Sequence, residues 1–374
     1  MNKALSPVFL LYALTLLVFS FITVDLVLAF DLQPKARLHL DYAHHDDDVK
    51  PLDDGWIIRR ATIDFSGKFD RNWEFEVGYN LSDGRDIRFS SDAFRDAALT
   101  WKGWSAANLT IGQFKLPLGL EELTSSNNIS FVERALPVDA FVPSRRIGIG
   151  LVRERRNYTM SAMAFSTSIG DRYQGQGFGL RLTLAPVLNQ RTVIHLGAAA
   201  VTEDPGGKVK FDVAPESRVG DVDLVNTGGI DGAQHINRLG LEGAWRHGPY
   251  SMQAEWIMAD IRRRTDFASA WFDGWYVNGS WVLTGEMRPY KYGKFKGIKP
   301  ESSFGALELT TRYSRIDLDS TDVRGGFEHN FTVGLNYYLN EHVRVMLNYI
   351  RAHSERRGVT DDPNIILLRT QFVL

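Results

Sequence analysis

Residues 363–374 read PNIILLRTQFVL, and this stretch has the pattern of a complete β-strand. Apolar and polar side chains alternate along it, so that one face carries Ile366, Leu368, Phe372 and Leu374. The opposite face carries Arg369 and Gln371. A closed β-barrel has no free edge, and its last strand must pair with its first. An apolar strand in this position therefore predicts a barrel that this strand closes.

The same alternation, with a period of two, recurs along most of the chain. In WEFEVGYNL (73–81), for example, the apolar side chains oppose Glu74 and Glu76. The pattern predicts an all-β protein of about sixteen strands. They lie near 36–43, 56–69, 73–82, 93–102, 107–115, 146–153, 157–168, 175–186, 189–203, 235–246, 249–260, 271–284, 304–316, 328–339, 341–354 and 363–374.

Tight connections alternate with long polar ones along this series. The short ones include DRN (70–72), RHGP (246–249) and LNE (339–341). The long ones include HHDDDVKPLDDG (44–55) and the stretch around 203–234. Short turns at one end and long loops at the other are typical of an antiparallel outer-membrane barrel. EMRPYKYGKFKGIKPE (286–301) is long where a short turn is due. Either the strand count differs there, or that turn is extended.

A secreted β-sandwich would alternate in the same way and is the alternative fold. The polar faces of the predicted strands carry many charges, which suit a wet lumen and not a dry core. Tryptophan and tyrosine also gather near strand ends, as they do in the girdles at the two membrane interfaces. These residues are Trp56, Trp73, Trp101, Trp104, Trp271, Trp275, Tyr337 and Tyr338. Both features favour the barrel.

The composition excludes several other classes of protein. The formal net charge of -2 gives no global basic excess for binding nucleic acid. The chain has no cysteine, which excludes a disulfide framework and thiol chemistry. Beyond Ala29 the longest apolar run is VIHLGAAAV (193–201). It has about half of the roughly 20 residues that a membrane helix needs.

The first residues have the pattern of an export signal. Lys3 supplies a short positive region, residues 9–24 are apolar, and small residues favour cleavage after Ala29. An uncleaved signal anchor is the alternative, because the apolar run is long for a leader. We expect residues 1–29 to be a signal peptide and residues 30–374 to be the barrel.

Eight motifs, in order, resemble the phosphate-selective porin O and P family, and they cover most of the chain. They are IGQFKLPLGLEELTSS (111–126), VERALPVDAF (132–141), RRIGIGL (145–151), VNTGGI (225–230), WVLTGEMRPY (281–290), ALELTTRYSRIDL (306–318), RGGFEHNFTVGLNYYLN (324–340) and RTQF (369–372). A weaker match lies at WIIRRATIDFSGKF (56–69). Members of the family usually end on phenylalanine, whereas here Val373 and Leu374 follow Phe372.

The resemblance implies a 16-stranded antiparallel transmembrane barrel in the bacterial outer membrane, usually a homotrimer, that passes small anions. It implies that the third long loop, about 116–145, folds into the lumen and narrows it. The partners it implies are inorganic phosphate or other small anions, together with outer-membrane lipid and lipopolysaccharide. It implies no cofactor.

A selective pore needs donors around a constriction, and arginine and lysine side chains match phosphate oxygens. Lys115 and Arg134 lie in the motifs of the constriction loop, so the resemblance makes them the leading site residues. Each has a structural alternative, an ion pair with a nearby carboxylate. The candidates are Glu121 or Glu122 for Lys115, and Glu133 or Asp139 for Arg134.

Two pairs of adjacent arginines complete the candidate set. Only one of Arg145 and Arg146 can face the lumen if both lie on a strand. With Ile63 facing lipid, strand parity places Arg60 inside and Arg59 outside, unless Arg59 lies above the bilayer or beside a bulge. Further arginines on the predicted wall could form a ladder for anions or pair with neighbouring carboxylates: Arg37, Arg181, Arg312, Arg344 and Arg369.

The other polar clusters have simpler interpretations. HHDDD (44–48) could hold a divalent cation, but such runs on loops are usually solvated, so we expect no metal site. IRRRTD (261–266) fits a surface loop that faces lipopolysaccharide phosphates or water. His353 and Ser354 are adjacent and so point to opposite faces of a strand, which argues against a catalytic pair. The sequence contains no G-x-S-x-G, H-E-x-x-H or P-loop pattern.

The sequence thus favours a passive, anion-selective channel for phosphate or a related oxyanion, and not an enzyme. Two alternatives stay open. One is a weakly selective pore for small polar solutes, with which the net charge of -2 is compatible. The other is an outer-membrane barrel enzyme, such as a hydrolase.

Overall fold

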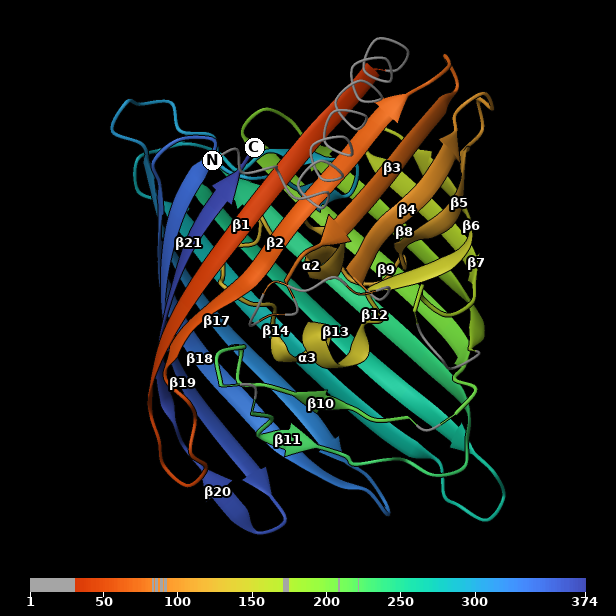
Figure 1. The fold of residues 1–374 in the computed structure, drawn as a ribbon, viewed down its shortest axis with the longest axis vertical. Helices are drawn as coiled ribbons and strands as arrows, with labels where there is room; N and C mark the ends of the chain where they lie inside the picture. Colours follow the sequence, from red (N-terminus) through yellow and green to blue (C-terminus); the bar gives the residue numbers. More distant parts are fainter. Residues whose placement is uncertain are drawn as a thin grey trace, which may run out of the picture.

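The computed structural model describes residues 31–374, except 83, 85–86, 88–89, 91–92, 171–174, 208 and 221. The expected signal peptide, residues 1–29, lies outside the described residues. Sixteen strands form one closed antiparallel barrel (Figure 1). They are β1 (Asp31–Asp46), β2 (Gly55–Lys68), β3 (Trp73–Asn80), β4 (Phe94–Trp101), β5 (Asn108–Lys115), β6 (Arg145–Glu154), β7 (Tyr158–Phe165), β8 (Gln176–Leu188), β9 (Thr192–Asp204), β12 (Ala233–His247), β13 (Tyr250–Arg263), β14 (Ala270–Val282), β17 (Ala306–Asp319), β18 (Arg324–Tyr338), β19 (Val343–Arg356) and β21 (Asn364–Val373).

The last strand closes the ring. β21 pairs with β1 over Arg37–Asp46, while its other edge pairs with β19. Ile366 and Phe372 are exposed on the outer face of β21, whereas Arg369 and Gln371 are buried on the inner face. The predicted closing strand is therefore confirmed, and each of the sixteen predicted segments coincides with a barrel strand. A short strand, β20 (Val359–Asp361), pairs antiparallel with the last residues of β19, Ser354–Arg356.

The alternation in sequence separates the outer from the inner surface. On β8, the side chains of Leu180, Leu182 and Leu184 are 44, 54 and 47% exposed, while Arg181 and Thr183 between them are buried. Water is absent from the hydrocarbon layer, so the outward positions must be apolar, whereas a hydrated lumen accepts polar groups. Within the described residues, no helix is long and apolar enough to cross a membrane.

β1 begins and β21 ends at the same end of the barrel, which we call the terminal end (Figure 1). The turns at this end are short, as at residues 155–157, 189–191 and 248–249. The exception is residues 283–305, between β14 and β17, which carry the small hairpin β15 (Tyr290–Lys291) and β16 (Lys294–Phe295). The strand count is unchanged there, so the extended turn was the correct alternative of the two.

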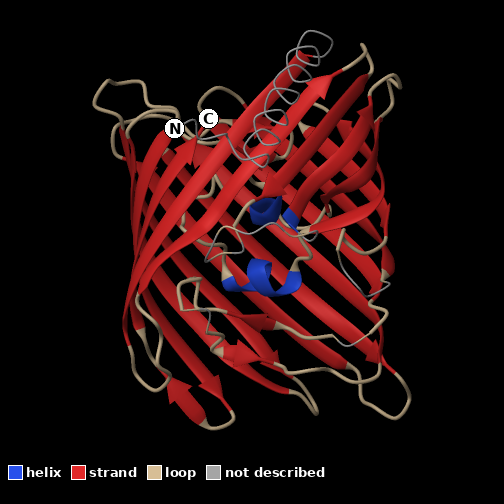
Figure 2. Ribbon diagram, viewed as in Figure 1, coloured by secondary structure: helices blue, strands red, loops and turns tan. Residues whose placement is uncertain are grey.

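Two segments from the far end fold into the barrel (Figure 2). One is the constriction loop, residues 116–144, with α2 (Leu120–Leu123) and α3 (Leu136–Phe141). The other is residues 205–232, with β10 (Asp212–Val213) and β11 (Val225–Asn226). Their apolar side chains pack with those of β13 and β14 into one core, in which Phe211 touches both Phe141 and Phe272. The predicted inward-folded loop at about 116–145 is confirmed.

Candidate functional site

Side chains of the barrel wall hold the helices of the constriction loop. The free N–H groups of Leu120 and Glu121, at the start of α2, donate to the Glu255 carboxylate of β13 at 2.6 and 2.7 Å. The N–H of Leu136, at the start of α3, donates to Ser314 Oγ of β17 at 3.2 Å. The first N–H groups of a helix have no partner within it, so acceptors on the wall fix where each helix begins.

The extended part of the loop is held by its carbonyl groups. Each of the carbonyls of residues 128–130, 132 and 133 accepts a hydrogen bond from a side chain of the wall or of the 283–305 segment. The donors are Arg288 to Asn128 at 2.7 Å, Arg344 to Ile129 at 3.0 Å, Asn336 to Ser130 at 2.8 Å, Arg369 to Val132, and Arg312 to Glu133 at 3.0 Å. A buried carbonyl needs such a partner. The loop is thereby fixed along β17, β18, β19 and β21.

The opposite side of the lumen stays open. A central cavity of about 510 Å³ lies between the loop and the first strands of the barrel. It shares Glu76, Val152 and Lys294 with a cavity of about 480 Å³ toward the terminal end. It shares Arg95 and Arg145 with a cavity of about 300 Å³ toward the far end. The three cavities follow one another along the barrel axis and define a path through it.

Cations dominate the lining of the central cavity. Nine arginine and lysine side chains line it: Arg37, Arg60, Arg95, Lys115, Arg134, Arg145, Arg181, Lys294 and Lys296. Four carboxylates line it: Glu76, Asp96, Glu122 and Glu154. The local balance is positive although the whole chain has a net charge of -2. In a confined lumen this imbalance attracts anions.

Lys115 and Arg134 meet at one carboxylate. Lys115 Nζ lies 3.1 Å from Glu122 Oε1, and Arg134 Nε lies 2.9 Å from Glu122 Oε2. Of the partners considered from the sequence, Glu122 is correct for Lys115. Arg134 also pairs with Glu122 and, among the described residues, forms no ion pair with Glu133 or Asp139. Glu122 belongs to the loop and not to a membrane-spanning strand. Burial alone would raise its pKa, but Arg134 and Lys115 outweigh burial and lower the pKa to about 2.

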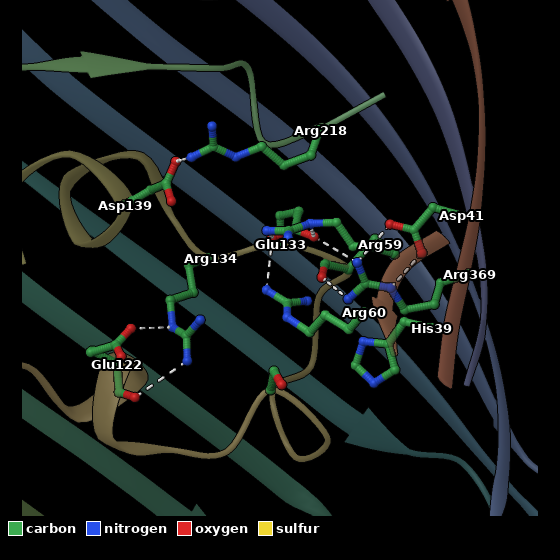
Figure 3. A network of polar contacts seen from close by, with 12 residues as sticks. His39, Asp41, Arg59, Arg60, Glu122, Glu133, Arg134, Asp139, Arg218 and Arg369 are labelled. Carbon is green, nitrogen blue, oxygen red and sulfur yellow. Dashed lines mark hydrogen bonds and ion pairs between the residues drawn. The ribbon is translucent and has the colours of Figure 1, made fainter. Parts of the chain in front are cut away.

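A second loop carboxylate, that of Glu133, forms ion pairs with three arginines (Figure 3). Arg59 Nε lies 2.8 Å, Arg60 Nη2 3.6 Å and Arg369 Nη2 2.6 Å from its oxygens. Parity alone would point Arg59 outward, but the exception considered from the sequence, a β-bulge, applies. The register between β1 and β2 shifts after His39, so that Arg59 is the extra residue of a β-bulge. The bulge turns both Arg59 and Arg60 toward the loop, although only Arg60 lines the central cavity.

The arginines that follow the loop also both face the lumen. Arg145 Nη2 lies 2.8 Å from Asp96 Oδ2, and Arg146 Nη2 lies 3.3 Å from Glu203 Oε1. Both line the cavity toward the far end, whereas only Arg145 reaches the central one. The expectation that only one could face inward is therefore wrong. β6 begins at Arg145, where the chain leaves the loop and regular alternation has not yet begun.

The five wall arginines divide into two groups. Arg37 pairs with Asp64 at 3.3 Å, Arg181 pairs with Glu242 at 2.6 Å, and both line the central cavity. The other three, Arg312, Arg344 and Arg369, are buried and hold the loop, so they do not continue a ladder along this cavity. Pairing with a carboxylate, one of the two alternatives considered from the sequence, therefore holds for Arg37, Arg181, Arg312 and Arg369, whereas Arg344 has no ion pair among the described residues. A ladder for anions stays a prediction for Arg37 and Arg181.

Three cavity cations were missed by reasoning from the sequence. The side chain of Arg95 extends from β4 into the central cavity, and its Nη1 lies 2.8 and 3.0 Å from the two carboxylate oxygens of Asp64. Lys294 and Lys296 come from the 283–305 segment and have no ion pair among the described residues. Four lysines in an unusually long turn were the signal for the last two. Arg95 gave no signal, because its strand is short and only weakly alternating.

The polar clusters outside the lumen add no further chemistry. No group of three or more histidine, aspartate or glutamate side chains that could hold a metal ion occurs in the part of the chain that the structure describes. In the HHDDD run, Nδ1 of His44, near the end of β1, lies 2.5 Å from Oδ2 of Asp54 on the following loop. His353 Nδ1 lies 2.5 Å from Asp362 Oδ1, on the outer side of β19, while Ser354 is buried on the inner side.

A closed 16-stranded barrel with a cation-lined constriction defines an outer-membrane porin, which is a channel and not an enzyme. The chain belongs to the phosphate-selective porin O and P family, whose model matches residues 32–374. The family predicted from the motifs is therefore confirmed. Family membership and the positively charged constriction together identify an anion-selective porin.

A sequence relative agrees with this assignment, and solved structures share the fold. Porin O of Pseudomonas aeruginosa is 28% identical over 396 residues, which cover 92% of this chain and 88% of that protein. OmpT, an outer membrane protein of Vibrio cholerae, has a TM-score of 0.62 and 11% identity, covering 92% of this chain and 98% of that one. An anion-selective porin from Comamonas acidovorans has a TM-score of 0.53 and 10% identity, covering 92% and 100%. At these identities the two structures show a common fold alone.

Proposed function

We propose that the protein is a passive channel for inorganic phosphate or a closely related oxyanion. The observation that carries this is the excess of nine cations over four carboxylates in the central cavity. Lys115 and Arg134 are the leading anion ligands, and Arg60, Arg145 and Arg146 support them along the path. Arg59 lines none of these cavities and supports them only through its ion pair with Glu133 beside the path. Guanidinium groups present paired N–H donors that fit phosphate oxygens, and lysine adds a compact charge.

The ion pairs along the path explain how the channel can attract an anion without binding it too tightly to release it. Asp64 is shared by Arg37 and Arg95, and Glu122 is shared by Lys115 and Arg134. Each such set keeps an excess positive charge that can attract an anion, while its carboxylate limits how tightly the anion binds. A channel needs this balance, because an ion that binds too strongly cannot leave.

Neutralising either leading ligand should weaken phosphate binding. In Lys115→Gln or Arg134→Gln, a passing anion loses a charge-assisted hydrogen bond worth about 1.5–3 kcal/mol. The phosphate concentration that half-blocks chloride current should then rise about tenfold, since about 1.4 kcal/mol is one decade. Planar-bilayer conductance in chloride, titrated with phosphate, measures this.

Lys299→Gln is the matched control, because Lys299 is 69% exposed and lines none of the described cavities. It should leave the block unchanged. A parent channel that prefers cations, or that phosphate never blocks, would contradict the phosphate assignment. The weakly selective general pore would then be the better description. If phosphate blocks the parent and neither Lys115→Gln nor Arg134→Gln alters the block, Arg60 and Arg146 become the next candidate anion ligands.

We further propose that the mature protein starts at Phe30 and forms a homotrimer with both termini in the periplasm. β3, β4 and β5 have 8 residues each. A strand that spans the membrane alone needs about 9–11 residues. A wall of three short neighbouring strands fits an interface between copies better than contact with lipid. The apolar outer faces of the longer strands contact outer-membrane lipid, and the exposed Arg262 and Arg264 reach lipopolysaccharide phosphates at the far end.

Native mass spectrometry of the purified protein tests the signal peptide and the trimer together. The expected mass is three times that of residues 30–374, and denaturation should give the single chain with that sequence. A denatured mass that includes residues 1–29 would contradict the cleavage. A native mass of one chain in mild detergent would contradict the trimer.

A further inference from the structure

The carboxylate between Lys115 and Arg134 occupies the position that an incoming oxyanion would need. Glu122 Oε1 accepts from Lys115 Nζ at 3.1 Å and from Ser144 Oγ at 2.9 Å, while Oε2 accepts from Arg134 Nε at 2.9 Å. Two cations and a hydroxyl around two oxygens form an oxyanion site, and the protein's own side chain fills it.

We propose that Glu122 is a built-in competitor that sets the anion affinity of the constriction. This rests on the proposed function of the channel. A passing oxyanion takes over the donors of Lys115, Arg134 and Ser144, and the Glu122 carboxylate returns to them when the anion leaves. The competing ligand shortens the stay of each anion, and it lowers affinity for every oxyanion that needs these donors.

Backbone contacts keep the two cations near the cavity while the carboxylate is displaced. Lys115 Nζ also donates to the carbonyl of Glu122, and Arg134 Nη2 donates to the carbonyls of Glu122 and Thr124, each at 3.3 Å. These acceptors are neutral, so the cations keep their full charge toward the path. The Glu122 side chain is therefore the only anionic partner of Lys115 and Arg134 within 4 Å among the described residues.

The other carboxylates of the central cavity have different surroundings. Asp96 pairs with Arg145, and neither Glu76 nor Glu154 forms an ion pair with a described residue. Glu76 adds negative charge to the same cavity without contacting Lys115 or Arg134. Glu76→Gln is therefore a matched control, which changes the charge of the cavity but releases neither ligand.

Glu122→Gln should tighten phosphate block of the chloride current about tenfold relative to the parent channel. Glu76→Gln should change it by less than twofold, because only the general field changes. Glu122→Asp keeps the charge and should stay within about twofold of the parent. Equal effects of Glu122→Gln and Glu76→Gln, or no tightening in Glu122→Gln, would overturn the inference. Glu122→Ser, which also removes the carboxylate, carries the same expectation and serves if Glu122→Gln does not assemble.

Phosphate block of the parent channel, compared with that of Glu122→Gln, distinguishes failure of this inference from failure of the proposed function. If phosphate does not block the parent but blocks Glu122→Gln, Glu122 is the competitor and the native channel is not a phosphate channel. If phosphate blocks the parent and Glu122→Gln is blocked no more tightly, the phosphate function stands and the role of Glu122 fails. Heat-dependent migration on gels shows that each variant is a closed barrel before its conductance is compared.

Discussion

Replacing Arg369 with methionine should destabilise the barrel and release the constriction loop. The guanidinium is fully buried, and its nitrogens lie 2.7 and 2.6 Å from the Asp41 oxygens and 2.6 Å from Glu133 Oε1. Asp41 has no other ion pair among the described residues, and its side chain is 1% exposed. Leaving such a carboxylate alone costs about 3–5 kcal/mol.

The effect on conductance should follow from the same contacts. Arg369 also donates to the carbonyl of Val132, so its loss leaves the loop held to β21 only by the longer bond from Gln371 to the carbonyl of Asn127 at 3.4 Å. We expect a lower unfolding midpoint in urea, together with larger and noisier single-channel currents and weaker phosphate block. Arg369→Lys should fall between the parent and Arg369→Met, because lysine keeps the charge but lacks the two-pronged geometry.

A double variant distinguishes loss of the Arg369–Asp41 ion pair from loss of side-chain packing as the cause of the lower stability. Asp41→Asn combined with Arg369→Met removes the orphaned carboxylate and should recover much of the lost stability. The loop should stay released, because the bonds to Val132 and Glu133 are still missing. Unchanged stability in Arg369→Met alone would contradict the view that Arg369 is a structural anchor.

A charge on the lipid face should reduce assembly far more than the same charge one residue away. Leu151 is 40% exposed on the outer face of β6, while its neighbour Val152 lines the central and terminal-end cavities. Leu151→Arg places a charge in lipid, at about 2–4 kcal/mol near the midplane. Val152→Arg places it in a wide, hydrated lumen, where solvation persists.

The yield of heat-modifiable barrel in purified outer membranes measures the difference. Leu151→Arg should give a small fraction of the parent yield, and Val152→Arg should stay close to it. Val152→Arg should also lower single-channel conductance, because the longer side chain narrows the path. Equal yields for the two variants would contradict the assignment of inner and outer faces on β6.

The strands and the closing of the barrel could be predicted because they depend on local pattern. A side chain on a strand points to alternate faces, so lipid outside and water inside impose the period of two on the sequence itself. Leu180, Leu182 and Leu184 illustrate this, since spacing alone places them on one face. The same pattern at residues 363–374 identified the closing strand.

The lining of the pore was decided by tertiary structure. The anchor of Arg369 is Asp41, 328 positions away in the sequence, and that of Arg312 is Glu216. Spacing cannot reveal such pairs, because they form only when the closed barrel and the inward loop bring distant strands together. Arg59 shows the second reason, since one extra residue in β2 reverses the face that parity assigns. Sequence alone therefore determined which residues lie on the barrel wall. The folded loop decided which arginine and lysine side chains in the lumen remain available to an anion.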